Sequence, residues 1–317
     1  MAAFLLRRLG HALLVLLVVC TVTFAIVHAA PGGPSLLADP KLSVAERQAI
    51  AERLGVDRPL PEQYARWLTR LMRGDLGNSF LYETSTLTTI AQRLPNTLLL
   101  AGAALLVTIV VAIPAAAACA ARPGGWVDRI ASALAMGAIS VPVFWLGILC
   151  ILVFAVRLGV LPAGGAASTD GGASIADRLR HLVRPALVLA AAGTAELLRY
   201  TRASALQQFT RPFVRTARAK GVGEHRVRWR HGMRNALIPA VTVIGLQLPR
   251  LVGGAAITET VFSWPGMGRL GIEAALARDY PLVMGITLVV SGGVLVASLL
   301  VDLAYVALDP RIRPEQA

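Results

Sequence analysis

Residues 199–234 read RYTRASALQQFTRPFVRTARAKGVGEHRVRWRHGMR, with ten arginines and lysines against a single acid, Glu224. Apolar runs lie on both sides of this stretch, and they are long enough for a helix to cross a bilayer, which takes roughly 20 residues. A short loop this rich in Arg and Lys marks the cytoplasmic face of a membrane protein. The stretch therefore predicts a multi-pass, all-α membrane protein with a basic cytoplasmic loop at 199–235.

The composition agrees with a membrane protein. Of 317 residues, 56% are hydrophobic and 15% are charged, whereas soluble proteins carry about 25% charged residues. The net charge of +13 would also suit a nucleic-acid partner, but the positive charge is concentrated in one loop between spans. Membrane topology explains that distribution, so we expect no nucleic-acid binding.

The chain contains no recognisable catalytic or cofactor motif. It has no G-x-x-x-x-G-K-[ST] phosphate loop and no hydrolase or metalloprotease signature. Its three cysteines lie inside apolar runs and lack the spacing of metal ligands. We therefore expect no catalytic residues, no metal site and no bound cofactor on this chain, and we do not expect it to be an enzyme.

Six apolar runs are candidates for membrane spans. Three are uncharged and clear, 97–121, 130–156 and 281–301. A fourth, at about 9–27, follows Arg7 and Arg8; we favour a retained span there, with a cleaved signal peptide as the alternative. The weaker runs are 185–198, which contains Glu196, and 236–261, which contains two prolines, Arg250 and Glu259.

Topology decides whether the weak run at 185–198 counts as a span. With a cytoplasmic N-terminus, the basic loop is cytoplasmic only if an even number of spans precedes it, so we retain 185–198. Six spans result, with both termini in the cytoplasm. The predicted segments are 1–95, with the first span and an extracytoplasmic part, 96–308, with the remaining spans, and a cytoplasmic tail at 309–317 that carries Arg311 and Arg313.

The region between the first two spans carries helix signals. Ser43 and Glu46 form a capping-box pattern, and Gly55 is a natural helix stop. A second helix follows Pro59-Leu60-Pro61 and ends at Gly74, with Tyr64, Trp67, Leu68 and Leu71 on one face. These patterns predict a small helical cap on the extracytoplasmic side.

The basic loop should itself contain a short helix. Thr210 can cap it, Pro212 suits its first turn, and Gly221 suits a left-handed stop. Phe213 and Ala217 are spaced to share one helix face. Charge alone would make this loop an ordinary cytoplasmic anchor, but the cap and the stop together indicate a defined structure.

Several sequence segments resemble one family of transporters. Arg215-Thr216-Ala217-Arg218-Ala219-Lys220-Gly221, followed by Arg234-Asn235-Ala236-Leu237-Ile238-Pro239, resembles the "EAA" loop of ABC-importer permeases of the dipeptide/oligopeptide type. Further matching segments occur in family order at 4–9, 54–60, 73–79, 93–97, 259–268, 278–281 and 309–313. Over essentially its whole length, the chain is similar to the first permease subunit of peptide importers.

This resemblance implies a type I importer fold in the bacterial cytoplasmic (inner) membrane. The chain would form half of a translocation pathway that works by alternating access. A second homologous permease, two ABC ATPases that hold ATP and Mg, and an extracytoplasmic solute-binding protein would complete the transporter. The residues that would couple to the ATPase are Phe213, Arg215, Thr216, Ala217, Arg218, Ala219, Lys220 and Gly221. The implied cargo is a dipeptide or oligopeptide, with a nickel chelate or glutathione as alternatives.

The chain departs from the family pattern in two places. The general EAA pattern begins Glu-Ala-Ala, whereas Arg215-Thr216-Ala217 stands here, as in the peptide branch. Pro249-Arg250 replaces small or apolar residues. Arg250 would lie roughly 20 Å into the membrane, where a charge faces a cavity or a partner. We therefore predict that Arg250 lines the translocation path, with Glu259 as another candidate there and as a possible partner in a purely structural pair.

A transporter of a different class is the main competing interpretation. A self-sufficient secondary transporter or channel would show internal repeats and ion-coupling carboxylates near the middle of the membrane. The sequence has no convincing repeat, and Glu196, Arg250 and Glu259 are the only charges inside its later spans.

Overall fold

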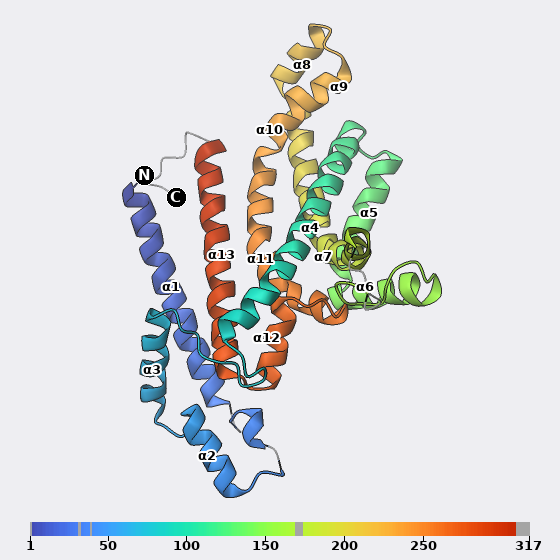
Figure 1. Ribbon diagram of the computed structural model, residues 1–317. Helices are drawn as coiled ribbons and strands as arrows, with labels where there is room; N and C mark the ends of the chain where they lie inside the picture. The colour runs from blue at the N-terminus through green and yellow to red at the C-terminus, as the bar shows by residue number, and fades with distance from the viewer. Residues whose placement is uncertain (1, 31–32, 39, 169–173, 309–317) are drawn as a thin grey trace. The chain divides into compact units, whose positions relative to one another are not determined.

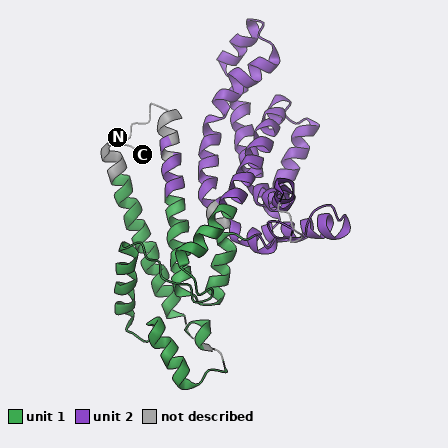
Figure 2. Cartoon of the chain, in the orientation of Figure 1, with its two compact units in different colours: residues 1–97, 265–295 green, residues 98–264, 296–317 purple. Residues whose placement is uncertain are grey.

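The computed structural model describes residues 2–30, 33–38, 40–168 and 174–308. Within these ranges the regular structure is helical, apart from one isolated β-bridge between Asn78 and Ser85. The chain divides into two compact units (Figure 2). Unit 1 comprises residues 1–97 and 265–295, and unit 2 comprises residues 98–264 and 296–317. The predicted tail at 309–317 lies outside the described residues.

Four helices are long and apolar enough to cross a membrane. They are α1 (Ala2–Ala29), α4 (Thr86–Ala121), α7 (Ile175–Phe209) and α13 (Tyr280–Leu308), all shown in Figure 1. Two more candidates are bent helix pairs, so the described residues contain four to six spans. The six spans predicted from the sequence correspond to the count in which each bent pair is one span.

The first bent pair contains a break that the sequence pattern did not predict. The run at 130–156 predicts one span, and the structure divides it, because α5 (Trp126–Ser140) and the following helix differ in direction by 107°; the pair is either one broken span or a re-entrant loop. That following helix consists of α6 (Val143–Cys150) and a π-helical segment, Ile151–Arg157. The break occurs at Val141-Pro142, where Val141 has φ −88° and ψ 126°. A residue before proline is pushed out of the α region, and proline provides no N–H for the helix.

The span predicted at 185–198 is also different in the structure. It is the central part of α7, which has 35 residues and contains Pro185 in its interior. Ser174 caps the helix by accepting a hydrogen bond from the N–H of Asp177. The charged residues near both ends of α7 made the apolar part look short in the sequence. Helix α4 similarly begins at Thr86, so the sequence-derived boundary at 95 falls inside it.

The two helices predicted between the first spans are confirmed in unit 1. In α2 (Val44–Leu54), Ser43 and Glu46 form the reciprocal capping box, and Gly55 ends the helix with φ +70°. The second helix, α3 (Leu60–Met72), packs against α1. The rings of Tyr64 and Trp67 lie 5.1 and 6.4 Å from that of Phe24 in α1. The predicted apolar face of α3 is therefore used in packing.

A buried carboxylate joins two distant parts of unit 1. Asp279 is fully buried directly before α13. One of its oxygens accepts hydrogen bonds from the Ser79 hydroxyl (2.5 Å) and the Leu81 N–H (2.9 Å), and the other accepts from the Leu282 N–H (3.1 Å). Asp279 thus caps α13 and fixes the loop around residues 79–81. In the same unit, α12 (Met267–Leu276) packs on Ile90 of α4.

Small side chains allow close helix packing in unit 2. Parts of α4, α5, α7 and α11 (Ile238–Val261) share one apolar cluster. Its buried members are Ala112, Ala135, Ala195, Leu197, Leu198, Ala240 and Val243. Small residues let helix backbones approach one another in lipid, where the hydrophobic effect gives little attraction between helices. The nearly buried Asp128 of α5 adds a two-point ion pair with Arg202 of α7.

Replacing Asp279 by Ala should destabilise the protein. The change leaves the buried Ser79 hydroxyl and two backbone N–H groups without their acceptor, which costs roughly 2–3 kcal/mol. Asp279→Asn keeps one acceptor oxygen and should therefore destabilise the protein less than Asp279→Ala. Asp75→Ala is the matched control, because Asp75 is exposed and, among the described residues, its side chain accepts a hydrogen bond only from the Gly77 N–H. Thermal unfolding of the purified protein measures all three; equal melting temperatures for Asp279→Ala and Asp75→Ala would contradict the assigned role.

Candidate functional site

The basic loop contains a short exposed helix, α8 (Pro212–Ala219), which follows α7 directly. Pro212 occupies its first position, as predicted. Thr210 does not cap it, which corrects the sequence-based assignment. Thr210 instead ends α7, and its hydroxyl donates to the Gln207 carbonyl. Arg211 is the N-cap residue, with extended backbone and no capping side-chain hydrogen bond.

The C-terminal end of α8 is closed by a complete Schellman motif. Gly221 has φ +75°, the left-handed conformation that the sequence predicted. Its N–H donates to the Arg218 carbonyl, and the Val222 N–H donates to the Ala217 carbonyl. These are the two bonds that define the motif, and the usual apolar contact between its ends is also present, because Val222 packs on the cluster that contains Ala217. The helix therefore has a fixed end.

Helix α8 has a small apolar core of its own. Val214 and Ala217 are buried against Val227, which begins the π-helical segment Val227–Met233. Phe213 does not share the environment of Ala217, although the sequence predicted one common face, because 40% of Phe213 is exposed. The exposed residues of α8 and its C-terminal end include Phe213, Arg215, Thr216, Arg218, Ala219, Lys220 and Gly221. Seven of the eight predicted coupling residues are thus accessible, and Ala217 supports them from beneath.

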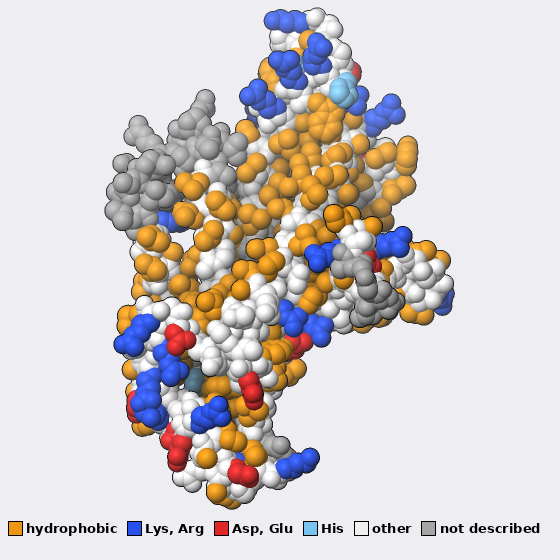
Figure 3. Space-filling model, viewed as in Figure 1, with side chains coloured by type: hydrophobic (Ala, Val, Ile, Leu, Met, Phe, Trp, Pro, Cys, Tyr) orange, Lys and Arg blue, Asp and Glu red, His pale blue; other side chains and the backbone are white. Residues whose placement is uncertain are grey.

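Electrostatics further stiffen this loop. Glu224 begins α9 (Glu224–Arg226), and its carboxylate accepts hydrogen bonds from Arg218 at 2.7 and 3.4 Å. The hydrogen bond from Arg218 holds the pKa of Glu224 below its usual range, and the charge of Arg228 acts in the same direction. The acid is therefore ionised at neutral pH and links the end of α8 to the start of α9. Figure 3 shows the blue side chains that gather over this end of unit 2.

A second feature of unit 2 is an open cavity of about 1020 Å³ between α5, α7 and α11. Ser132 and Met136 of α5 line it, together with Glu196 and Tyr200 of α7 and Arg250 of α11. Arg250 has 71% of its side chain exposed, and its Nη1 atom lies 3.2 Å from Glu196 Oε2. The cavity thus presents a cation and an anion next to each other, and Arg199 and Arg202 of α7 also line its wall.

Glu259 has different surroundings from Arg250. It is completely buried near the end of α11, and its backbone carbonyl accepts a hydrogen bond from the Trp264 N–H. The acid that pairs with Arg250 is Glu196, whose position within an apolar run was the only sequence signal for it. Helix α11 bends by 55° between 238–251 and 255–261, directly after Pro249 and Arg250. In the described part of the chain, no group of three or more metal-ligating side chains is close enough to hold a metal ion.

Comparison with known proteins identifies the family. A family model described as "Binding-protein-dependent transport system inner membrane component" matches residues 109–314. A second, described as "Binding-prot-dependent transport system membrane comp, N-term", matches residues 1–101. Together the two matches cover nearly all of the chain.

Individual relatives match over their full length. The oligopeptide transport system permease protein AppB of Bacillus subtilis is 40% identical over 314 residues, which covers 98% of this chain and 99% of that protein. The glutathione transport system permease protein GsiC of Pectobacterium atrosepticum is 38% identical, and the dipeptide transport system permease protein DppB of Escherichia coli is 36% identical. Each of these two alignments covers 99% of both chains. The chain belongs to the family of binding-protein-dependent transport system inner membrane components, the permease subunits of ABC importers.

Proposed function

We propose that the chain forms half of a peptide translocation pathway and receives the energy of ATP hydrolysis through α8. The observation that carries this proposal is the construction of α8 itself. It is a basic helix with a closed C-terminal end, an apolar core of its own and an exposed Phe213, and a merely positive anchor needs only the charge. Because the chain lacks a phosphate loop, ATP and Mg would be held by two partner ATPases.

The full transporter would contain three further kinds of subunit. A second homologous permease would complete the pathway, ABC ATPases would dock on α8, and a solute-binding protein would deliver cargo to the opposite face. In this proposal the chain crosses the bacterial inner membrane six times with both termini in the cytoplasm, and α2 and α3 form the extracytoplasmic cap. The concentration of Arg and Lys in the loop at 199–235 supports this orientation, because short loops rich in these residues stay in the cytoplasm.

Relatives favour a peptide as the cargo. Two of the similar permeases are named for oligopeptide and dipeptide transport, and a third is named for glutathione transport. The Arg250–Glu196 pair supports a zwitterionic cargo, because a peptide brings a carboxylate for the arginine and an ammonium group for the acid. Glutathione, itself a short peptide derivative, is the second candidate. Competition between unlabelled dipeptides, oligopeptides and glutathione for uptake of a labelled dipeptide distinguishes these cargoes.

Substituting Gly221 should weaken the coupling between transport and ATP hydrolysis. In the left-handed conformation a Cβ costs about 1 kcal/mol, although no atom lies within 4 Å of the position it would occupy. Gly221→Ser should therefore reduce ATP-driven uptake and co-purification of the ATPase roughly fivefold, the equivalent of about 1 kcal/mol. The amount of permease in the membrane should not change.

Gly223→Ser is the matched control for this experiment. Gly223 is also unobstructed, but it has φ −58° and is the N-cap of α9, a position that favours Ser. It should retain wild-type coupling. If Gly221→Ser also retained it, the loop would act only as a positively charged anchor.

Replacing Arg250 by Ala should lower peptide uptake without disrupting the protein. An exposed ion pair contributes no more than about 1 kcal/mol, so assembly and basal ATP hydrolysis should persist. The charge-exchanged double variant, Arg250→Glu with Glu196→Arg, separates two roles. If the pair is structural, the exchange restores it and transport recovers. If Arg250 contacts the cargo, transport remains impaired in the double variant. Recovery of transport in the double variant would therefore exclude the cargo role.

Cysteine labelling tests the orientation of the chain in the membrane. In a variant without the three native cysteines, single cysteines at Glu62 and Ala275 should react from outside intact cells, and one at Glu224 should be protected. Ala275 suits this experiment because its side chain is exposed. Labelling of the cysteine at Glu224 from outside would refute both the six-span topology and the coupling proposal.

A further inference from the structure

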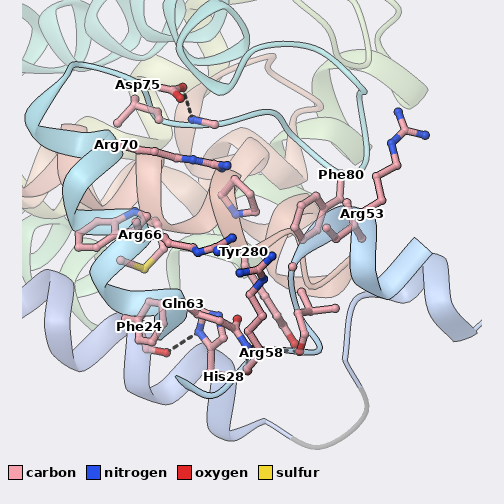
Figure 4. Close-up of a pocket in the computed structure, with 18 of the residues that line it drawn as sticks. Phe24, His28, Arg53, Arg58, Gln63, Arg66, Arg70, Asp75, Phe80 and Tyr280 are labelled. Carbon is pink, nitrogen blue, oxygen red and sulfur yellow. Dashed lines mark hydrogen bonds between the residues drawn. The ribbon is translucent and has the colours of Figure 1, made fainter. Parts of the chain in front are cut away.

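Unit 1 contains a separate cavity of about 240 Å³ that the transport site does not include. It lies among α1, α2, α3 and the start of α13, and Figure 4 shows it in detail. Its wall is aromatic: Phe24 stacks on His28 with ring centroids 3.9 Å apart, and His28 lies 4.5 Å from the ring of Tyr280. Trp67 and Phe80 also line it. The volume is several times the 30 Å³ or so that one water molecule occupies in the liquid, so it can admit a polar group of several atoms.

Arginines give this cavity an excess of positive charge. Arg58 and Arg66 share one acid, Glu62, at 2.7 and 3.0 Å. The guanidinium of Arg70 has no hydrogen bond or ion pair with any residue in the described ranges. In Figure 4, Arg66 and Arg70 extend in the same direction from α3 toward the cavity that Arg58 also enters, whereas Arg53 points away. Two carboxylates, Glu52 and Asp75, also line the cavity, and the arginines of its lining, Arg53 included, outnumber them by four to two.

The cavity lies at the ends of two candidate membrane spans. Phe24 and His28 belong to the last two turns of α1, whose span runs from Arg7 to Ala29, and Tyr280 is the first residue of α13. Tyrosine and tryptophan are enriched where a span meets water, as they are here. Leu13 and Leu17 of α1, which share the helix face of Phe24, are 59% and 46% exposed, so apolar surface is available along that face toward the middle of the span. The arginines therefore lie where phospholipid headgroups lie.

We propose that this cavity binds the phosphate of an anionic phospholipid, whose acyl chains follow the exposed side of α1. Guanidinium groups pair with phosphate oxygens through two parallel N–H···O bonds, and Arg58, Arg66 and Arg70 supply several such donors. The aromatic rings accommodate the glycerol part and the first methylene groups. A soluble anion would use the arginines equally well, but it would make no use of the adjoining apolar surface. The bound lipid is distinct from cargo, so this inference does not depend on the proposed transport function.

The test uses the full-length chain in nanodiscs that contain equal amounts of phosphatidylglycerol and phosphatidylcholine with identical acyl chains. Native mass spectrometry counts the lipids that stay bound after release. The wild type should retain phosphatidylglycerol in preference to phosphatidylcholine. Arg70→Gln should weaken this retention roughly tenfold, because it removes a charge-assisted hydrogen bond to the phosphate, worth about 1.4 kcal/mol. Arg70 has no partner among the described residues, so its loss should not affect folding.

Arg73→Gln is the matched control, because it removes the same charge from the end of the same helix but does not alter the cavity lining. It should retain phosphatidylglycerol like the wild type. Equal loss in both variants, or equal retention of the two lipids by the wild type, would overturn the proposal. A further arm adds soluble glycerol phosphate in excess to the detergent-purified protein. Displacement of phosphatidylglycerol at concentrations comparable to the lipid would assign the site to a free phosphate ester and exclude the lipid.

Discussion

The backbone of a membrane span must satisfy its own hydrogen bonds, and the rest of this structure depends on that constraint. Hydrocarbon offers no partner for a free N–H or C=O group, so the chain crosses as helices and leaves helical geometry only for a local reason. Proline supplies that reason at Pro142, where α5 ends. In α11 the bend follows Pro249 and adjoins the open cavity that Arg250 lines. Irregular backbone is tolerated at membrane depth when it borders a cavity or other protein.

Features that depend on neighbouring residues could be predicted from the sequence. The capping box at Ser43, the stop at Gly55, Pro212 in the first turn of α8 and the left-handed Gly221 all follow from side-chain chemistry within a few residues. Span boundaries were less accurate for a physical reason. Hydropathy reports the apolar centre of a helix, but α7 extends beyond that centre at both ends through segments that contain charged residues. The run at 130–156 is likewise apolar throughout, so its hydropathy gave no sign of the break at Pro142.

Contacts between distant segments could not be predicted in this way. Asp279 and Ser79 are 200 positions apart, and Arg250 and Glu196 are 54 apart. Nothing near any of these residues in the chain indicates its partner. The role of Val214 was missed for the same reason, because it depends on Val227 beyond the turn at Gly221. Thr210 shows a limit even for local signals. It lies between the end of α7 and the start of α8, and in the structure it is the C-cap of α7.

The position of α8 in the chain gives a physical basis for coupling at a distance. It follows α7 directly and reaches α11 through α9, the π-helical segment and α10 (Arg234–Ala236). These two long helices carry Glu196 and Arg250, the charged pair of the cavity. Coupling between distant sites requires elements that move without deforming. If the helix in this loop had a flexible C-terminal end, a force from an ATPase would deform the loop itself and would not displace the neighbouring helices. Because α8 has a fixed C-terminal end and its own core, a displacement applied to it would pass into α7 and α11 and change the cavity that they share.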